Sequence, residues 1–146
     1  RQQVPTGVYT REAFDDFGRR LMPLFEPAPP PEERWSGVQE ALDAIRDLKG
    51  NELVVLDLRG LTDATDFFVI ASGTSDAHVR GIAESVMEKL DRRGHRTHHV
   101  EGLTGGRWVL LDFVDFVIHL FHPETRSFYQ LERLWNDAPE LLVSST

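Results

Sequence analysis

The sequence predicts an α/β fold in which helices pack on a mixed five-stranded sheet. Five short segments have the length of strands, and four of them are predominantly apolar. Two of them, Leu53–Leu58 and Phe67–Ala71, are almost uninterrupted, as expected of central strands covered on both faces. Around them lie segments whose apolar residues recur at spacings of three and four, which is typical of amphipathic helices. A chain of 146 residues can bury the core that such a fold needs.

The composition is that of an ordinary globular protein, with 40% hydrophobic and 27% charged residues. No apolar run approaches the roughly 20 residues that cross a bilayer, so we expect no membrane association. Cysteine is absent, which excludes disulfides, thiolate metal sites and cysteine nucleophiles. The formal net charge of −8 argues against broad binding to nucleic acid phosphates and favours a basic partner.

The chain divides near residues 27–34 into an extension and a domain. Thr10 can cap a short helix with a Phe/Leu stripe, and the PAPPP segment that follows reads as a semi-rigid linker. Residues 1–34 are therefore assigned to an N-terminal extension with a Pro-rich linker, and residues 35–146 to one domain. The extension holds six acids, whereas transit peptides are poor in acids and signal peptides have an apolar middle. We expect a cytoplasmic protein.

Capping signals delimit two helices in the first half of the domain. Ser36 and Gln39 form a capping box for a helix that ends before Gly50. A second helix is capped at residues 75–76 and is stopped by Gly94. Each helix has its apolar residues on one side, so both are expected to pack on the sheet.

Three strands and a helix complete the domain. A short strand at 97–100 leads to strands at 108–113 and 115–121, and Pro123 occupies a first-turn position of the last helix. That helix is predicted to place three large apolar residues on one face: Phe128, Leu131 and Trp135.

The last two strands form a hairpin with one unusual face. With residues 113–114 as the turn, Trp108 lies opposite His119 and Asp112 opposite Asp115. The other face is plainly core, whereas this one mixes a Trp, a His and two acids with apolar neighbours and resembles a contact surface. Alternatively, Trp108 covers the edge of the core and the acids are turn residues. Two facing acids require turn hydrogen bonds or a positive partner.

Acidic residues gather toward the C-terminal end. Residues 101–146 hold seven acids and three arginines, whereas residues 76–96 hold four acids and five basic residues. On the last helix, Glu124, Tyr129 and Glu132 lie mostly away from the predicted apolar face. A solvated helix surface explains such residues, and contact with a basic partner is the alternative.

A Gly-Ser turn at residues 72–75 raises the alternative of a nucleotide-binding or nucleotidyltransferase-type enzyme, because free backbone N–H groups at a helix start can hold phosphate. Such enzymes need two metal-binding acids on one strand face, whereas Asp112 and Asp115 are three residues apart and straddle a turn. Helix capping is the simpler role for the turn. The histidines lack a plausible third and fourth ligand, and no nucleophile elbow occurs, so we predict no catalytic residue, metal or cofactor.

Three segments closely resemble the ribosomal silencing factor (Iojap) family: Asp66–Ser75 (DFFVIASGTS), Trp108–Asp112 (WVLLD) and Asp112–Trp135. The resemblance covers about residues 36–140 and implies a nucleotidyltransferase-like fold without enzymatic activity. Val114 departs from the family, which usually has Gly there. Because valine resists the positive φ of a type I′ turn, we expect another turn type.

The resemblance implies a protein that binds the large ribosomal subunit, chiefly its basic fourteenth protein at the intersubunit face. Steric exclusion of the small subunit would repress translation when nutrients are scarce. Family members also tend to form homodimers, and no sequence-specific nucleic acid binding is expected. By motif position Trp108 is the expected anchor among the candidate partner-binding residues, which are Trp108, Asp112, Asp115, His119, Glu124, Tyr129 and Glu132.

Overall fold

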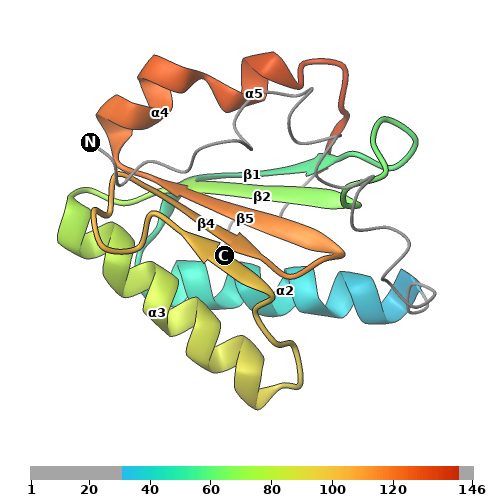
Figure 1. Ribbon diagram of the computed structural model, residues 1–146, viewed down its shortest axis with the longest axis horizontal. Helices are drawn as coiled ribbons and strands as arrows, with labels where there is room; N and C mark the ends of the chain where they lie inside the picture. The colour runs from blue at the N-terminus through green and yellow to red at the C-terminus, as the bar shows by residue number, and fades with distance from the viewer. Residues whose placement is uncertain (1–30, 142–146) are drawn as a thin grey trace.

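The computed structural model describes residues 31–141 of the 146-residue chain. They form three layers, with α2 and α3 on one face of a sheet and α4 and α5 on the other (Figure 1). In chain order the elements are α2 (Pro31–Asp47), β1 (Asn51–Asp57), β2 (Phe67–Ser72), α3 (Asp76–Arg92), β3 (His99–Glu101), β4 (Trp108–Asp112), β5 (Phe116–Phe121), α4 (Pro123–Tyr129), α5 (Leu131–Leu134) and β6 (Glu140–Leu141).

The sheet is mixed, as predicted, but it has six strands rather than five, in the order β3-β4-β5-β2-β1-β6. Strands β2 and β5 run parallel, and the other neighbouring pairs are antiparallel. The strand that the prediction missed, β6, consists of Glu140 and Leu141 paired with β1. Two residues are too few to show the alternation by which a strand is detected in a sequence.

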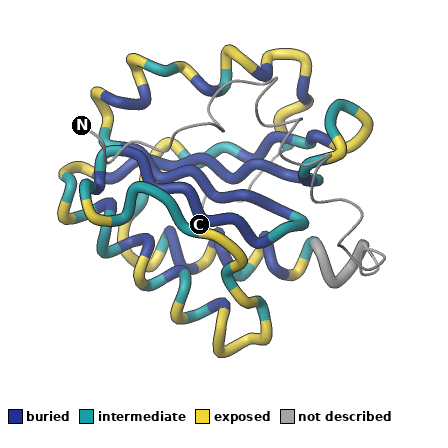
Figure 2. The backbone as a smooth tube through the Cα atoms, viewed as in Figure 1, coloured by how far each residue is buried: buried dark blue, intermediate teal, exposed yellow. Residues whose placement is uncertain are grey.

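The central strands are buried on both faces, whereas exposed residues lie mainly on the outer sides of the helices and in the loops (Figure 2). Under α2 and α3 the sheet contributes an apolar layer that includes Val69, Val109 and Ile118. Under α4 and α5 a second cluster contains Phe68, Trp108 and Trp135, among others. Two separate hydrophobic layers therefore hold the helices on the sheet, as expected of strands that read as continuous apolar runs.

The first described helix begins earlier than predicted. It starts at Pro31, inside the segment assigned to the linker, so Ser36 lies within the helix and the predicted capping box is wrong. Proline suits the first helical position, because its missing N–H would have had no partner there. The helix predicted after Thr10 and the linker residues 27–30 lie outside the described residues.

The predicted last helix is two short helices. Gln130 adopts the left-handed conformation, with φ 49° and ψ 56°, and separates α4 from α5. The break changes which side chains face the sheet: Leu131 and Trp135 are 2% and 1% exposed, whereas Phe128 is 79% exposed. The predicted common face of these three residues is therefore wrong. Among the helices of residues 31–141, none combines the length and hydrophobicity that a membrane crossing requires.

Candidate partner-binding face

The β4–β5 hairpin has the predicted faces but a different register. Trp108 pairs with Phe121, Leu110 with His119 and Asp112 with Val117. The turn residues are therefore Val114 and Asp115, one position later than predicted, and Asp112 does not lie opposite Asp115. Moving the turn by one residue shifts the pairing partner by two, which keeps every side chain on its predicted face.

We predicted a turn type other than I′, and the structure confirms this. Val114 nevertheless has a positive φ of 74°. The Asp115 N–H donates to the Phe113 carbonyl oxygen over 2.9 Å, a bond that spans two residues as in a γ-turn. The Asp112 Oδ1 accepts from the Val114 N–H (2.8 Å), and the Thr65 hydroxyl donates to the Val114 carbonyl oxygen (2.8 Å). These bonds hold valine in a conformation that β-branched residues rarely adopt.

Asp112 is therefore a buried turn residue. It is 8% exposed, and burial raises the pKa of its carboxyl group, while the Val114 N–H and the nearby His98 and His99 oppose that shift. Of the two alternatives left open for the acids, turn hydrogen bonding describes Asp112. Asp115 is half-buried at the tip of the turn, where its carbonyl oxygen accepts from the Asp66 N–H over 3.0 Å.

Trp108 and His119 form a buried polar pair under α4. The Trp108 Nε1–H donates to His119 Nδ1 over 3.1 Å, and both side chains are 0% exposed. Complete burial lowers the pKa of His119 to about 3, so the imidazole is neutral at physiological pH. Because Nδ1 accepts from Trp108, the proton lies on Nε2, which has no hydrogen-bond partner within residues 31–141.

The expectation that Trp108 and His119 present an exposed contact surface is wrong for this fold. Trp108 stacks on Phe121 with ring centroids 4.9 Å apart and contacts Tyr129 at 5.0 Å. His119 meets Phe68 edge to face at 4.4 Å. The physical reason is that α4 and α5 fold back over this side of the sheet and complete a second core, which the strand pattern could not distinguish from a solvent-facing surface.

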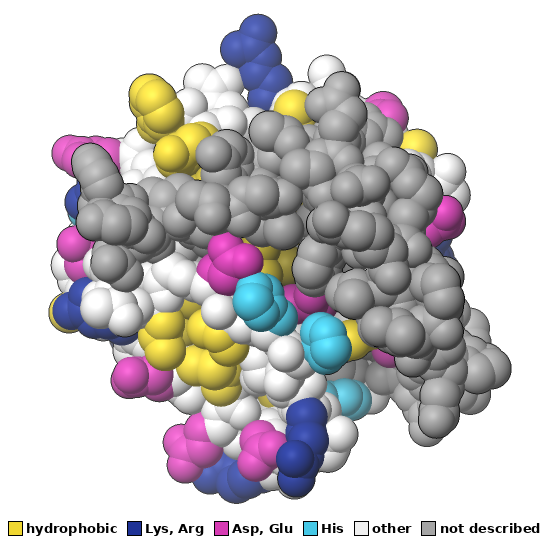
Figure 3. All heavy atoms as spheres, viewed as in Figure 1, with side chains coloured by type: hydrophobic (Ala, Val, Ile, Leu, Met, Phe, Trp, Pro, Cys, Tyr) yellow, Lys and Arg dark blue, Asp and Glu magenta, His cyan; other side chains and the backbone are white. Residues whose placement is uncertain are grey.

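The outer side of α4 carries the exposed apolar surface instead. Phe128 is 79% exposed and lies edge to face against the half-buried Tyr129, with ring centroids 5.0 Å apart. Leu134 on α5 is 41% exposed. Hydrophobic side chains reach the surface over α4 in Figure 3. Sequence reasoning missed Phe128 as a surface residue, because only the break at Gln130 turns it away from the core.

The acids predicted for one patch lie at both ends of the sheet. Glu124 lies in the first turn of α4, after β5, and pairs with Arg107 over 3.3 Å, whereas Asp115 precedes β5. A six-residue strand separates them, which corresponds to about 20 Å at the usual rise per residue. Only Glu124, Tyr129 and Glu132 lie together on the α4–α5 layer, so the structure divides the predicted residue set into two groups.

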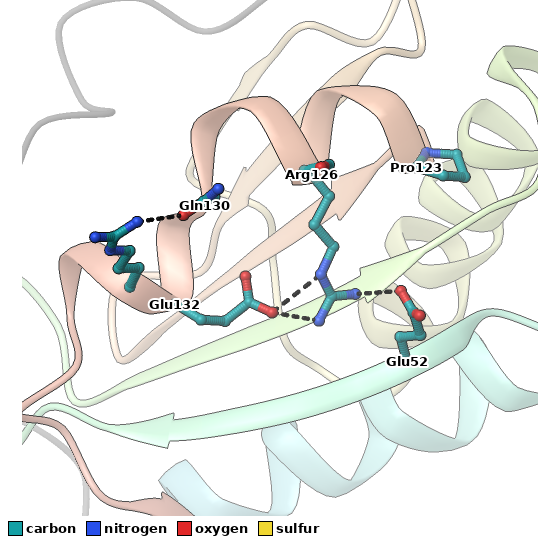
Figure 4. Close-up of a pocket in the computed structure, with 7 residues that line it drawn as sticks. Glu52, Pro123, Arg126, Gln130 and Glu132 are labelled. Atoms are coloured by element: carbon teal, nitrogen blue, oxygen red, sulfur yellow. Dashed lines mark hydrogen bonds and ion pairs between the residues drawn. The ribbon is translucent and has the colours of Figure 1, made fainter.

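A cleft of about 480 Å³ separates this layer from the start of β1, and Arg126 lies in it (Figure 4). The guanidinium group donates from Nε (3.0 Å) and Nη2 (2.6 Å) to Oε2 of Glu132 and from Nη1 to the Ser72 hydroxyl (2.8 Å). Glu52 lies 3.9 Å from Nη1. Arg126 thus joins α4 to α5 and to the sheet, although sequence reasoning did not select it.

The turn at residues 72–75 caps a helix, as predicted. The Ser75 hydroxyl accepts the His78 N–H over 3.0 Å, the Gly73 N–H donates to the Phe121 carbonyl oxygen and the Thr74 N–H to His78 Nδ1. Asp76 adds a carboxylate to the first helical turn. Because these donors have partners within the protein and an acid occupies the helix start, the geometry favours capping over phosphate binding. Within residues 31–141, no group of three or more His, Asp or Glu side chains is placed to hold a metal ion.

Comparison with known proteins identifies the family of this domain. The family model described as ribosomal silencing factor during starvation matches residues 31–146. The chain belongs to the ribosomal silencing factor family. These proteins are named for a regulatory rather than a catalytic role, and the matched segment begins at the first residue of α2.

Relatives in the ribosomal silencing factor family agree in sequence and in fold. The ribosomal silencing factor RsfS of Bacillus subtilis (strain 168) is 39% identical over 99 residues, which cover 68% of this chain and 84% of that protein. The RsfS of Halalkalibacterium halodurans is 38% identical over 102 residues, or 70% and 87%. An X-ray crystal structure of a Chromobacterium violaceum protein superposes with a TM-score of 0.69 at 33% identity and covers 77% of this chain and 94% of that one.

Proposed function

We propose that this protein binds the large ribosomal subunit and sterically blocks joining of the small subunit, which represses translation under nutrient limitation. The observation that carries the proposal is the match of residues 31–146 to the family of silencing factors that act during starvation. The mechanism needs a rigid body with a docking face and no bond-making chemistry. The three-layer fold, with two buried hydrophobic clusters, supports this role.

The contact is proposed to lie on the α4–α5 layer. Glu124 and Tyr129 reach its surface, and Glu132 lies at the cleft beside them. Trp108 supports Tyr129 from below, and His119 accepts a hydrogen bond from Trp108, so neither contacts the partner in this proposal because both are completely buried. Asp115 would make a separate contact at the other end of β5, in a turn that Asp112 holds in place.

The proposed partner is a basic protein of the large subunit, the fourteenth of its series. The net charge of −8 favours a basic surface over bare RNA phosphates, because anionic groups on both sides repel. Exposed carboxylates such as Glu124 would lie at the rim of the contact, where salt screens them. The complex is therefore expected to weaken as ionic strength rises. In the free state a cytoplasmic homodimer is expected, in line with membership of the family.

Co-sedimentation with purified bacterial ribosomal subunits tests the proposal. The protein should pellet with large subunits but not with small ones, and it should reduce the formation of complete ribosomes when small subunits are added afterwards. Preformed ribosomes provide the control, since their intersubunit face is already covered. Sedimentation with neither subunit, or undiminished subunit joining at saturating protein, would refute the function.

A further inference from the structure

We propose that Arg126 is the positioning residue of the α4–α5 face, because it sets the angle between the two helices and thereby the direction in which Phe128 and Tyr129 point. The inference rests on the proposed function, since the direction of these side chains matters only if a partner docks there. It assigns a role to a buried charge that the partner itself does not touch.

Arg126 is placed to control the break between the helices. Its side chain is 10% exposed, and its guanidinium group contacts Glu132 on α5 and Ser72 at the end of β2. Its backbone carbonyl oxygen accepts the Gln130 N–H over 2.9 Å. One residue therefore holds both sides of the break, and Figure 4 shows Arg126 pointing from α4 toward Glu132 and Glu52.

Backbone strain in the same cleft indicates that the arrangement around Arg126 is specific and is not an incidental surface ion pair. Gln130 has a φ of 49° and Glu52 a φ of 51°, and both line the cleft with Arg126. This region is sterically unfavourable for a non-glycine residue, and such strain persists only where neighbouring contacts impose it. At Gln130 no side-chain hydrogen bond caps α5, although the Gln130 side chain accepts from Arg133 over 3.2 Å. The Arg126–Glu132 pair is a direct side-chain contact between α4 and α5.

The consequence for the surface follows from the geometry of the chain. Phe128 and Tyr129 lie between Arg126 and the break at Gln130, and they pack edge to face. Tyr129 packs on Trp108 with ring centroids 5.0 Å apart, and we expect a change in the angle at the next residue, Gln130, to alter that packing. Arg126 thus acts on the partner through these aromatic side chains.

A double-mutant cycle in the full chain separates positioning from simple stabilisation. Arg126→Lys keeps the charge but cannot reproduce the planar set of donors to Glu132 and Ser72. With purified bacterial large subunits as the probe, Arg126→Lys should raise the apparent Kd about tenfold or more. Phe128→Ala should raise it about fivefold in the parent and less than about twofold in the Arg126→Lys background. Equal costs in both backgrounds would overturn the proposal.

Hydrogen exchange gives a readout that needs no ribosome. In Arg126→Lys, amides of residues 130–134 should exchange about tenfold faster or more, while those of α3 keep their parent rates. Unchanged exchange in α5 overturns the positioning role. If the parent itself does not bind large subunits, the proposed function fails, and exchange alone then decides the role of Arg126.

A second variant controls for the possibility that Arg126→Lys weakens binding by destabilising the fold. Arg126→Met combined with Glu132→Leu removes the buried guanidinium group together with its half-buried carboxylate partner and keeps apolar volume, a replacement that is often neutral for stability. The thermal unfolding midpoint should stay close to that of the parent, while the apparent Kd rises about tenfold. Parent-like binding by this double variant would show that the ion pair serves stability alone.

Discussion

The two faces of the sheet are built from different chemistry. Under α2 and α3 the core cluster is apolar throughout. By contrast, the buried polar and charged side chains of residues 35–141 all lie on the α4–α5 side or at the β4–β5 turn, and they are Thr65, Ser72, Asp112, His119, Thr125 and Arg126. Apolar packing tolerates exchange of similar side chains, whereas a buried polar group requires its specific partner. The α4–α5 side is therefore the one whose geometry is specified most narrowly.

The largest effect should come from Trp108, the side chain that links this layer to the sheet. Trp108→Ala removes its packing on Phe121 and Tyr129 and is expected to lower the free energy of unfolding by about 3–5 kcal/mol in urea denaturation. Leu111→Ala, on the apolar side of the same strand and also 0% exposed, is the matched control, with an expected loss of about 2–5 kcal/mol. A loss below about 1 kcal/mol for Trp108→Ala would contradict the burial of Trp108 and would favour its original assignment as an exposed contact residue.

A pH-dependent difference should distinguish the two faces, because only the α4–α5 side buries a histidine. The pKa of His119 is about 3 when folded, against 6.5 for the ordinary side chain, so the unfolded chain binds the extra proton between these values. Stability present at neutral pH is lost as pH falls below 6.5, by about 1.4 kcal/mol per unit, or about 2 kcal/mol at pH 5.

The control for this effect is His119→Asn, which keeps an acceptor for Trp108 but does not titrate. Chemical denaturation of both proteins at pH 7.5 and pH 5.0 gives the difference, in which the contributions of all groups other than His119 cancel. Parallel losses in parent and variant would mean that His119 is solvated.

A substitution in the β4–β5 turn should have a smaller effect of opposite sign on the free energy of unfolding. Val114→Gly relieves a positive φ of 74° and should raise the free energy of unfolding by about 1 kcal/mol, since glycine adopts this conformation without a steric penalty. Asp115→Gly, at the neighbouring turn residue, is the control and should be destabilising. Thermal or urea unfolding measures both, and a loss of stability in Val114→Gly would argue against the strained turn.

The smallest effect on stability is expected at Phe128, which is exposed although other residues of the same helix are buried. Because the ring is 79% exposed, Phe128→Ala should change stability by less than about 0.5 kcal/mol. Binding to large subunits should nevertheless weaken by about 1–2 kcal/mol, as for an exposed aromatic contact. Unaltered binding would place the contact elsewhere, with Asp115 and its turn as the next candidate.

The hairpin shows where prediction from sequence succeeds and where it stops. The alternation of apolar residues in β4 and β5 was sufficient to assign every side chain to its correct face, because the period of a strand is two. The register depended on contacts of the turn with Thr65 and Asp66, which are about fifty residues away in the chain. No local pattern contains that information.

Trp108 illustrates the same limit at the candidate site. Its position in the family motif was recognisable, yet whether its face meets solvent or a second core depends on where the following helices fold. The cleft around Arg126 combines residues 52, 72, 126 and 132, so no spacing in the sequence could indicate it. Sequence reasoning therefore found the layer and placed Leu131 and Trp135 correctly, but it assigned Trp108 and His119 to the surface and Phe128 to the core, which is the reverse of what the structure has.

By itself the sequence determined the α/β class, the mixed sheet, the cap of α3 at Ser75 and membership of the ribosomal silencing factor family. These follow from local periodicity, capping chemistry and motifs, which act over a few residues. Only the tertiary structure decided the sixth strand, the hairpin register, the break at Gln130 and the burial of Trp108 and His119. Each of these depends on contacts between distant segments, whose free energy outweighs local preference.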